Sequence, residues 1–453
     1  MNATITALLA TSFALAYVQG CAAPRPVAAA TSGATAEPVG GSASAQQSER
    51  SAPDRTVESP FVKDVGAEPE PPPGTSPSAA RRFGAKAPGA REFLVQPGQV
   101  WQHLVEDIRP GDEIVFPAGF HPPQAIVGLR GTRERPIVLR SRDRIAAAVG
   151  CGEVGWAFEG CSHVIVENIL FINPSGAAIA VGGGRAPGDA GPATSDVTIR
   201  QCTIRVSRTE PGQDAIRIRS ASDVIIDGVR VEGWTDSAVR IQDGRRVLVR
   251  GLVAIPNDAA PSSSGVRIEG GSSQVVITNA AFNRGTGTCI AVGTPGAGAP
   301  AAEDVTVERS IFDTCATALS IANARRVFFN RCTVVEPSEA VWAVDPAAAT
   351  VEAVRIENTL VEWSPGRLRR FSPHPAGSSP AGITIGDILV HSAELPTAWE
   401  VIGRPFGVQA GSLTEDVDPK LDRASLRPTV PQAQRFGAYV PPAPLNRAAP
   451  AAP

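Results

Sequence analysis

Lysine is almost missing from this sequence, because Lys63, Lys86 and Lys420 are the only lysines among its 42 basic residues. This scarcity excludes most chemistry that depends on a lysine amine. The five histidines are scattered along the chain without the spacing of a zinc site, so we predict no metal ligands among them. Tyrosine occurs only as Tyr17 and Tyr439. Their positions near the two ends disfavour a tyrosine-based reaction.

An excess of charge of one sign is also missing. The formal net charge is -3 and the isoelectric point is near 6.1. Proteins that bind nucleic acids usually carry a basic excess along one face. We therefore expect no nucleic-acid partner, and the local placement of charge is more informative than the total.

The apolar run at the amino end, Met1–Tyr17, is too short to span a membrane and is typical of a signal peptide. The following Val18-Gln-Gly-Cys21 resembles the bacterial lipobox, in which the cysteine is acylated. We expect residues 1–21 to be a signal peptide, with Cys21 either lipidated or incidental to an ordinary cleaved signal. Both alternatives predict export, to the cell surface, outer membrane or periplasm or as a secreted protein. Membrane contact would come only from the lipid.

Residues 22–92 are rich in Ala, Pro, Ser, Gly and Glu and show no apolar periodicity. Such a segment cannot bury enough surface to offset the entropy of ordering it, so it is predicted to be a disordered tether. Residues 431–453 have a similar composition and are predicted to be a flexible tail. The remaining residues, 93–430, are predicted to form one domain, and we expect a monomer.

A pattern of polar, apolar, any, apolar and polar residues recurs within this domain. Its first valines are Val164, Val197, Val224, Val247, Val275, Val305, Val327 and Val354. They are separated by as few as 22 residues, from 305 to 327, and as many as 33, from 164 to 197. A short minimum period with variable insertions, each repeat holding three β-rich runs, predicts an all-β parallel β-helix.

Two columns of residues follow from stacking these repeats. The third strand of each coil is predicted to point an apolar residue inward and so to form the core, through Phe171, Ile204, Val231, Ala254, Phe282, Phe312, Val334 and Val361. The residue that closes the valine strand points outward and alternates in sign through Glu167, Arg200, Asp227 and Arg250. Neighbouring strands lie about 4.8 Å apart, so this second column is predicted to be structural.

The ends of the coils and the cysteines allow further predictions. Residues 101–108 have helical spacing, and we expect a helix there to cap the first coil. Cys202 and Cys332 are predicted to be buried thiols. In an oxidising compartment, Cys151 with Cys161, or Cys289 with Cys315, are the alternative pairs for a disulfide.

Two segments carry a resemblance to a known family. Gly131-Thr-Arg-Glu-Arg-Pro-Ile-Val-Leu-Arg-Ser141 and Gly160-Cys-Ser-His-Val-Ile-Val-Glu-Asn-Ile-Leu-Phe171 resemble the pectate-lyase-like superfamily, most closely chondroitinase B and the alginate lyases. The resemblance covers roughly residues 93–430 and implies a single-stranded right-handed parallel β-helix that acts on or binds an acidic polysaccharide, with calcium as a cofactor. Those lyases use a lysine and an arginine for β-elimination. No lysine lies in any predicted coil, so only an arginine base, as in pectate lyases, is retained.

The candidate site lies on the first strand of each coil. Its outward position is predicted to read Ala180, Arg217, Arg240, Arg267, Ala291, Ser320 and Trp342. Like charges on adjacent strands repel, so three stacked arginines are unusual as a structural choice. Two positions later the column gives Arg219, Gln242 and Glu269 as substrate-binding candidates, and two positions earlier it gives the small residues Ala215, Ala238 and Gly265. We expect a shallow groove whose guanidinium groups hold carboxylate or sulfate.

Several functions fit these residues. In a lyase, Arg217, Arg240 and Arg267 would neutralise a uronate and supply the base, although arginine normally stays protonated. In a glycoside hydrolase, Asp214 and Asp236 would form the carboxylate pair. A noncatalytic glycan-binding or adhesive β-helix needs only the groove. The structural alternative is that the ladder is neutralised by ion pairs with Asp214, Asp236, Asp243 and Glu269.

Overall fold

The computed structural model describes residues 89–143, 147–183, 193–206, 212–256, 264–283, 287–296, 298–345, 348, 350–364, 382–391, 413–414, 419–422, 426, 428–434 and 436–438. All of them belong to one compact unit, Ser59–Pro453. The predicted signal peptide with Cys21 lies outside the described residues, as do residues 22–88 of the predicted tether. No helix among the described residues is long and apolar enough to cross a membrane.

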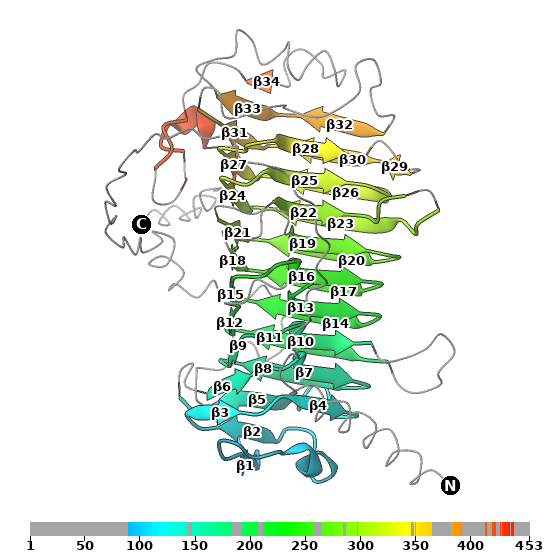
Figure 1. Cartoon of the computed structure of the whole chain (residues 1–453). Coiled ribbons are helices and arrows are strands. Elements are labelled where there is room, and N and C mark those ends of the chain that lie inside the picture. The colour runs from blue at the N-terminus through cyan, green and yellow to red at the C-terminus, as the bar shows by residue number, and fades with distance from the viewer. Residues whose placement is uncertain are drawn as a thin grey trace, which may run out of the picture. The chain divides into compact units, whose positions relative to one another are not determined.

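The described chain winds through three parallel sheets that run the length of a stack of coils (Figure 1). From β7 to β27, each coil gives one strand to each sheet. The nine-stranded sheet holds β4 (Gln124–Val127), β7 (Val154–Glu159), β10 (Ala177–Gly182), β13 (Asp214–Arg219), β16 (Ser237–Gln242), β19 (Ser264–Glu269), β22 (Thr288–Val292), β25 (Thr317–Ile321) and β28 (Ala340–Val344). These are the predicted first strands.

The predicted valine strands form the thirteen-stranded sheet. It holds β1 (Glu92–Leu94), β2 (Glu113–Phe116), β5 (Ile137–Ser141), β8 (Ser162–Glu167), β11 (Ser195–Arg200), β14 (Ser222–Asp227), β17 (Arg245–Arg250), β20 (Ser273–Thr278), β23 (Ala302–Glu308), β26 (Ala324–Asn330), β29 (Val351–Glu352), β30 (Val354–Glu357) and β32 (Ile383–Gly386).

The third strands form the twelve-stranded sheet. It holds β3 (Gly119–His121), β6 (Ala147–Gly150), β9 (Leu170–Ile172), β12 (Thr203–Arg205), β15 (Arg230–Glu232), β18 (Val253–Ile255), β21 (Ala281–Phe282), β24 (Ile311–Asp313), β27 (Thr333–Val335), β31 (Leu360–Glu362), β33 (Ile388–His391) and β34 (Leu413–Thr414). The sequence prediction of a parallel β-helix is therefore confirmed.

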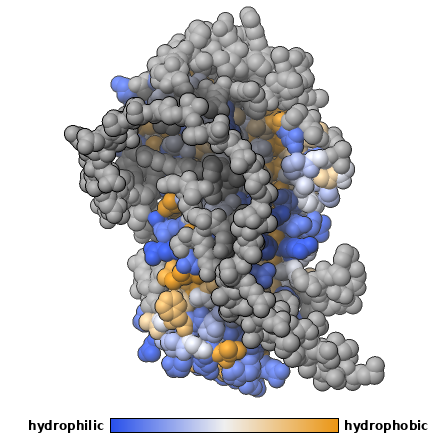
Figure 2. Space-filling view, in the orientation of Figure 1, coloured by the Kyte–Doolittle hydropathy of each residue, from blue (hydrophilic) through white to orange (hydrophobic). Residues whose placement is uncertain are grey.

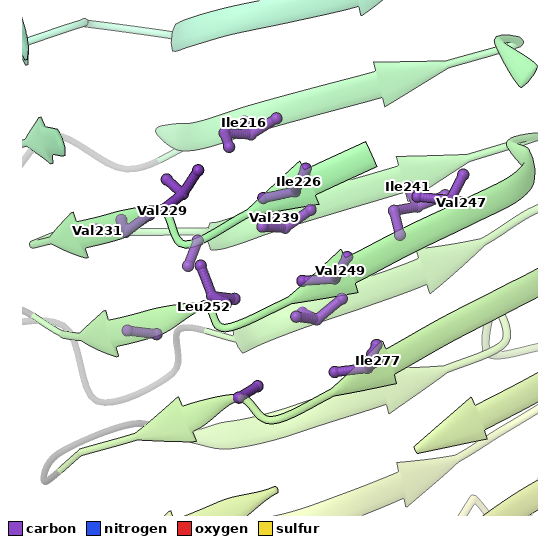
Figure 3. Close-up of a cluster of buried hydrophobic side chains, with 14 of the residues drawn as sticks. Ile216, Ile226, Val229, Val231, Val239, Ile241, Val247, Val249, Leu252 and Ile277 are labelled. Atoms are coloured by element: carbon purple, nitrogen blue, oxygen red, sulfur yellow. The ribbon is translucent and has the colours of Figure 1, made fainter. Parts of the chain in front are cut away.

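The core fills the space between the sheets. Figure 3 shows Ile216 and Val239 of the nine-stranded sheet and Ile226 and Val249 of the thirteen-stranded sheet directed into this interior. Val and Ile are stiff at χ1 and pack well on a pleated strand, which explains why they dominate these positions. The predicted apolar column from Phe171 to Val361 is in register throughout, and all eight of its side chains are fully buried.

The residue after the valine strand has a positive φ in successive coils, for example 56° at Asn168, 52° at Asn279 and 60° at Gly228. Asparagine and glycine adopt this left-handed conformation more readily than other residues. They let the chain turn from the thirteen-stranded to the twelve-stranded sheet within two residues. The recurrent amides and glycines at this position are thus explained by backbone geometry.

The alternating-sign column is structural, as predicted. Arg200 contacts Glu167 at 2.6 Å, and Arg250 contacts Asp227 at 2.5 Å. Each ion pair joins two adjacent coils. Arg250 and Asp227 are partly exposed, so their pair adds only modestly to stability, whereas Arg200 and Glu167 are largely shielded from solvent.

The predicted helix at the amino end is a five-residue 3-10 helix, η3 (Gln102–Glu106), which lies against β4. Pro110 and Gly111 follow soon after and stop it from lengthening. Trp101, just before η3, is fully buried and packs edge-on against Phe116 at 5.7 Å and Trp156 at 6.1 Å between ring centroids. This indole, more than the helix, closes the core at the first coil.

The described part of residues 431–438 packs on the last coils. This segment holds η5 (Pro431–Ala433), and Phe436 is buried against Leu360 and Leu389. The amide of Gly437 donates a hydrogen bond to the Asn358 carbonyl at 2.9 Å. The boundary at residue 430 between domain and tail stays a prediction. Residues 439–453 lie outside the described chain.

All six cysteines in the described chain are free thiols. Cys202 and Cys332 are buried, as predicted. Cys289 and Cys315 are also buried and their thiols hydrogen-bond to each other, whereas neither predicted disulfide is formed.

The surface of the coils is mixed in character. Hydrophobic and hydrophilic residues are interspersed on the face shown in Figure 2. Large apolar side chains are exposed mainly in the first coils, where Leu94, Val100, Phe120 and Val127 reach solvent. These four lie on different strands and turns.

The stacked aromatic rings in the core predict a large effect of truncation. Phe312 lies between Phe282 at 5.3 Å and Phe329 at 5.4 Å. Replacing Phe312 with Ala should cost about 3–5 kcal/mol of unfolding free energy, because it opens a cavity that rigid coils cannot collapse. The matched control is Phe328→Ala on the outer surface of β26, for which we expect a loss on the order of 1 kcal/mol. Urea unfolding followed by tryptophan fluorescence measures both, and equal losses would contradict the assigned register.

Candidate functional site

The outer face of the nine-stranded sheet carries the predicted ladder. We call its central outward position the outer column, which reads Ala125, Ala157, Ala180, Arg217, Arg240, Arg267, Ala291, Ser320 and Ala343. The three arginines are paired in register on adjacent strands, as predicted. Trp342 was assigned to this column wrongly, because its partner is Leu319 and its side chain is buried in the core.

The predicted groove of small residues is also wrong. Ala215 and Ala238 are fully buried in the core. A Cβ added to Gly265 would lie 2.5 Å from the ring of Phe282, so this position also faces inward. The simple alternation of a strand is broken at this point, because Ala215 and Ile216 both join the core. These small residues therefore provide core packing and no groove.

A column of oxygen-bearing side chains that the sequence analysis missed lies one residue earlier. It reads Asp214, Ser237, Ser264, Thr288 and Thr317 in register. It shares the face of the arginines, because the Asp214 carboxylate accepts a hydrogen bond from Nε of Arg217 at 2.8 Å, and Ser264 accepts one from Arg267 at 3.4 Å. The recurrence of Asp, Ser or Thr three residues before five successive outer-column residues, from Arg217 to Ser320, was the available signal.

Arg240 and Arg267 form a quartet with two carboxylates. Glu269 accepts a hydrogen bond from Nε of Arg240 at 2.8 Å, and Asp236 lies 3.4 Å from the same guanidinium. Asp236 also lies 2.9 Å from Arg267, and Glu269 lies 3.8 Å from it. Each arginine is thus shared between both carboxylates, which removes the repulsion expected between stacked like charges.

Arg217 is paired differently. Among the described residues its ion-pair partner is Asp214 alone, at 2.8 Å. Arg219, two residues on, is exposed and forms no ion pair with a described residue, and Gln242 is its register partner. Asp243, which was expected to neutralise the ladder, instead accepts a hydrogen bond from the Gly271 amide at 2.9 Å. Neutralisation by ion pairs is therefore observed for the three outer-column arginines, through three of the four predicted acids.

Burial changes the proton affinity of one carboxyl group in this cluster. Asp214 is fully buried, and burial raises its pKa above the usual value. The hydrogen bond and charge of Arg217 act in the opposite direction, and the nearby charge of Asp236 adds to the increase. One oxygen of this carboxyl, Oδ1, and the hydroxyl of Ser237 are buried without a hydrogen-bond partner. Burial and the nearby charge of Asp236 therefore favour the protonated form of Asp214.

The pKa of Arg240 is raised, and this disfavours Arg240 as a catalytic base. Burial works against its charged form, but the hydrogen bond and charge of Glu269 and the charges of Asp214 and Asp236 prevail and raise its pKa. A guanidinium with a raised pKa holds its proton more tightly. The geometry thus disfavours Arg240 as the base of a β-elimination.

The calcium implied by the family resemblance does not fit this cluster. Within the described ranges there is no group of three or more His, Cys, Asp or Glu side chains that could hold a metal ion. Asp214, Asp236 and Glu269 are each engaged by guanidinium groups, which would repel a divalent cation at the same oxygens.

The buried Asp214 predicts how stability depends on pH. Its folded-state pKa lies above the usual value of 3.8, so on raising the pH the unfolded chain releases this proton before the folded protein does. The contribution of Asp214 is thus greatest below the usual value and is lost as the pH rises through the folded-state pKa. Asp214→Asn cannot titrate, so the unfolding free energy of the unmodified protein should fall relative to this variant between about pH 4 and 8. Urea titrations across this range test the sign, and a constant or growing difference would contradict it.

Comparisons with known proteins concern the fold. A family model described as "Right handed beta helix region" matches residues 148–300 and, in an overlapping match, 192–356. No curated protein matches the chain. Solved structures that resemble it include the PL6 family alginate lyase AlyGC, with 14% identity and a TM-score of 0.45 over 77% of this chain and 56% of that one. The chain thus spans little more than half the length of AlyGC.

Two further structures are similar at the same level. An alginate lyase from Paenibacillus sp. str. FPU-7 has 14% identity and a TM-score of 0.42, covering 66% of this chain and 99% of that one. PfbA, a surface adhesin of Streptococcus pneumoniae, has 12% identity and a TM-score of 0.44, covering 67% and 80%. The family match and the stacked coils together show that this chain is a right-handed parallel β-helix protein.

Proposed function

We propose that the outer face of the nine-stranded sheet binds an acidic polysaccharide. The observation that carries the proposal is the placement of Arg217, Arg240 and Arg267 at one height on three adjacent strands. Their side chains are 35%, 29% and 25% exposed, so each guanidinium reaches solvent although it is paired on one side. A guanidinium has five N–H donors, and the one or two carboxylates that each arginine contacts do not use them all.

The charge balance of this face favours an anion. Four guanidinium groups, those of Arg217, Arg219, Arg240 and Arg267, face the three carboxylates of Asp214, Asp236 and Glu269. Among these seven described side chains the excess is one positive charge when all three acids are ionised. Asp243, in the turn after β16, accepts a hydrogen bond from the Gly271 amide and is not part of this set. The ion pairs also hold the guanidinium groups in place, so a ligand need not immobilise them. The face is therefore weakly cationic and preorganised.

The surface on either side of the arginines is flat. Ala125, Ala157 and Ala180 precede them in the outer column, and Ala291, Ser320 and Ala343 follow. Adjacent strands lie about 4.8 Å apart, so each group of three small side chains gives a strip on which an extended chain could lie along the stack. This surface replaces the groove expected from the sequence.

The predicted location is compatible with this proposal. A signal peptide in residues 1–21 would export the protein, and a tether in residues 22–92 would give the binding face reach from the membrane if Cys21 is lipidated. Export would bring the face into contact with extracellular polysaccharide. The monomeric state stays a prediction.

Removal of one arginine should weaken binding in a salt-dependent way. Arg240→Ala deletes the central guanidinium and leaves the carboxylates of Asp236 and Glu269 less neutralised, so affinity for a polyuronate should fall by roughly tenfold or more. The matched control is Arg250→Ala on the thirteen-stranded sheet, which breaks a similar ion pair with Asp227. Titration calorimetry with polyuronates at two salt concentrations measures both. Equal losses in the two variants would exclude this face as the binding site.

Glycoside hydrolysis is a second candidate function. The observation that favours it is that Asp236 raises the pKa of Asp214, so the two carboxyl groups lie close enough to interact. Paired carboxyls of which one keeps its proton and one stays charged are the usual acid and base of such enzymes. Asp236 is ion-paired with Arg267 and its side chain is 22% exposed.

Product analysis separates the catalytic functions from binding. Hydrolysis should release reducing ends from a polyuronate panel without ultraviolet absorbance, and Asp236→Asn should abolish the release. An unsaturated product would support β-elimination instead. Binding without either product, lost in Arg240→Ala, is the outcome expected of a noncatalytic glycan-binding protein.

A further inference from the structure

We propose that Asp214 is a proton-controlled counter-ion of Arg217, so that proton uptake at Asp214 strengthens the binding of an anionic chain to this face. The inference rests on the proposed function and adds a regulation of the same site. It follows from how the charges of the cluster are shared and from the position of Asp214 within it.

The three arginines do not depend equally on their partners. Arg240 and Arg267 share two carboxylates, so loss of one would still leave each with the other. Arg217 contacts the Asp214 carboxylate at 2.8 Å and forms no ion pair with any other described residue. Neutralising Asp214 therefore frees one guanidinium and leaves the quartet intact.

The surroundings of Asp214 favour its neutral form. The side chain is fully buried although it lies on the outer side of the sheet, and its Oδ1 has no hydrogen-bond partner. A buried carboxylate oxygen without a donor is costly, whereas a protonated carboxyl can donate to a nearby acceptor. Ser237, its register partner, has a buried hydroxyl without a partner. A proton on Asp214 would provide a donor beside that hydroxyl.

Within the described ranges, the charged groups that act on Asp214 are Arg217, Arg240 and Asp236. Arg217 lies on its own strand, and Arg240 and Asp236 belong to the next coil. On the other side, β10 presents the uncharged Ala177 and Ala180. Asp236 is the other titratable group among these, and it is held by Arg267 at 2.9 Å and Arg240 at 3.4 Å. The raised pKa of Asp214 agrees with this asymmetry.

Protonation would double the positive excess of the face. With Asp214 neutral, four guanidinium groups face only the two carboxylates of Asp236 and Glu269. One additional unpaired charge at a partly exposed site changes the affinity for an adjacent anion by roughly tenfold. The protein would therefore hold an acidic polysaccharide more tightly in an acidified environment.

Binding measured against pH tests the inference. A sulfated polysaccharide such as dextran sulfate is the probe, because sulfate esters keep their charge over the range used. The unmodified protein should bind roughly tenfold more tightly as the pH falls from about 8 to 4. Asp214→Asn should bind at every pH as tightly as the unmodified protein does at the acidic end.

Two further variants control for other titrating groups. Asp227→Asn removes the equivalent partner of Arg250 on the thirteen-stranded sheet and should keep the normal pH dependence. Arg217→Gln should bind more weakly and lose the gain at acidic pH, since the guanidinium that Asp214 controls is gone. Circular dichroism confirms that each variant is folded.

The outcomes separate the inference from the proposed function. Failure of the unmodified protein and of Asp214→Asn to bind dextran sulfate or polyuronate at any pH would overturn the proposed function. Binding that does not change with pH, or a normal pH dependence retained in Asp214→Asn, would overturn the role of Asp214 alone. Loss of the pH dependence of binding in Asp227→Asn would also overturn the role of Asp214, because the effect would then depend on a residue of the thirteen-stranded sheet.

Discussion

The structure depends above all on the register between adjacent coils. Parallel strands pair residue by residue, and a slip of one position would move every buried side chain to the outer surface. The Val and Ile columns prevent this, because Ile216, Val239 and their neighbours in the stack have no favourable position outside the core (Figure 3). Once the register is set, every outward residue has a defined neighbour one strand away. Both the structural ion pairs and the candidate site are consequences of that constraint.

The register between coils produces two different arrangements of charge on the outer surface. On the thirteen-stranded sheet, opposite charges alternate along one column, so Arg200 and Arg250 each have a carboxylate at the same height. On the nine-stranded sheet the three arginines are in register with one another. Their carboxylate partners lie at other positions, at the start of a strand for Asp214, at the end of a strand for Glu269 and in the turn before β16 for Asp236. The first arrangement cancels charge locally. The second keeps a small positive excess at the surface and makes it depend on one buried acid.

The position of Asp214 links the fold to function. It lies at the beginning of β13, where the strand does not yet alternate regularly, and this irregularity places a carboxyl group beside Arg217 but out of contact with water. In a regularly alternating strand, this carboxyl group would either be exposed, with an ordinary pKa, or point away from Arg217. The raised pKa of Asp214, on the face proposed to bind a polysaccharide, thus depends on how the coil begins its first strand. The equivalent turn of the next coil, before β16, brings Asp236 close enough to influence Asp214.

The sequence by itself determined the repeat, the three strands of each coil, the apolar column from Phe171 to Val361 and the stacking of the three arginines. Each of these follows from periodicity, which is a local property of the chain. The tertiary structure alone decided which residues beside the arginines face outward. Sequence reasoning assumed strict alternation and therefore placed Ala215 on the surface and Trp342 in the outer column, and it missed the column that runs from Asp214 to Thr317. The direction of a side chain at a strand's first residues depends on how the preceding turn meets the neighbouring coil, and no spacing along the chain records that contact.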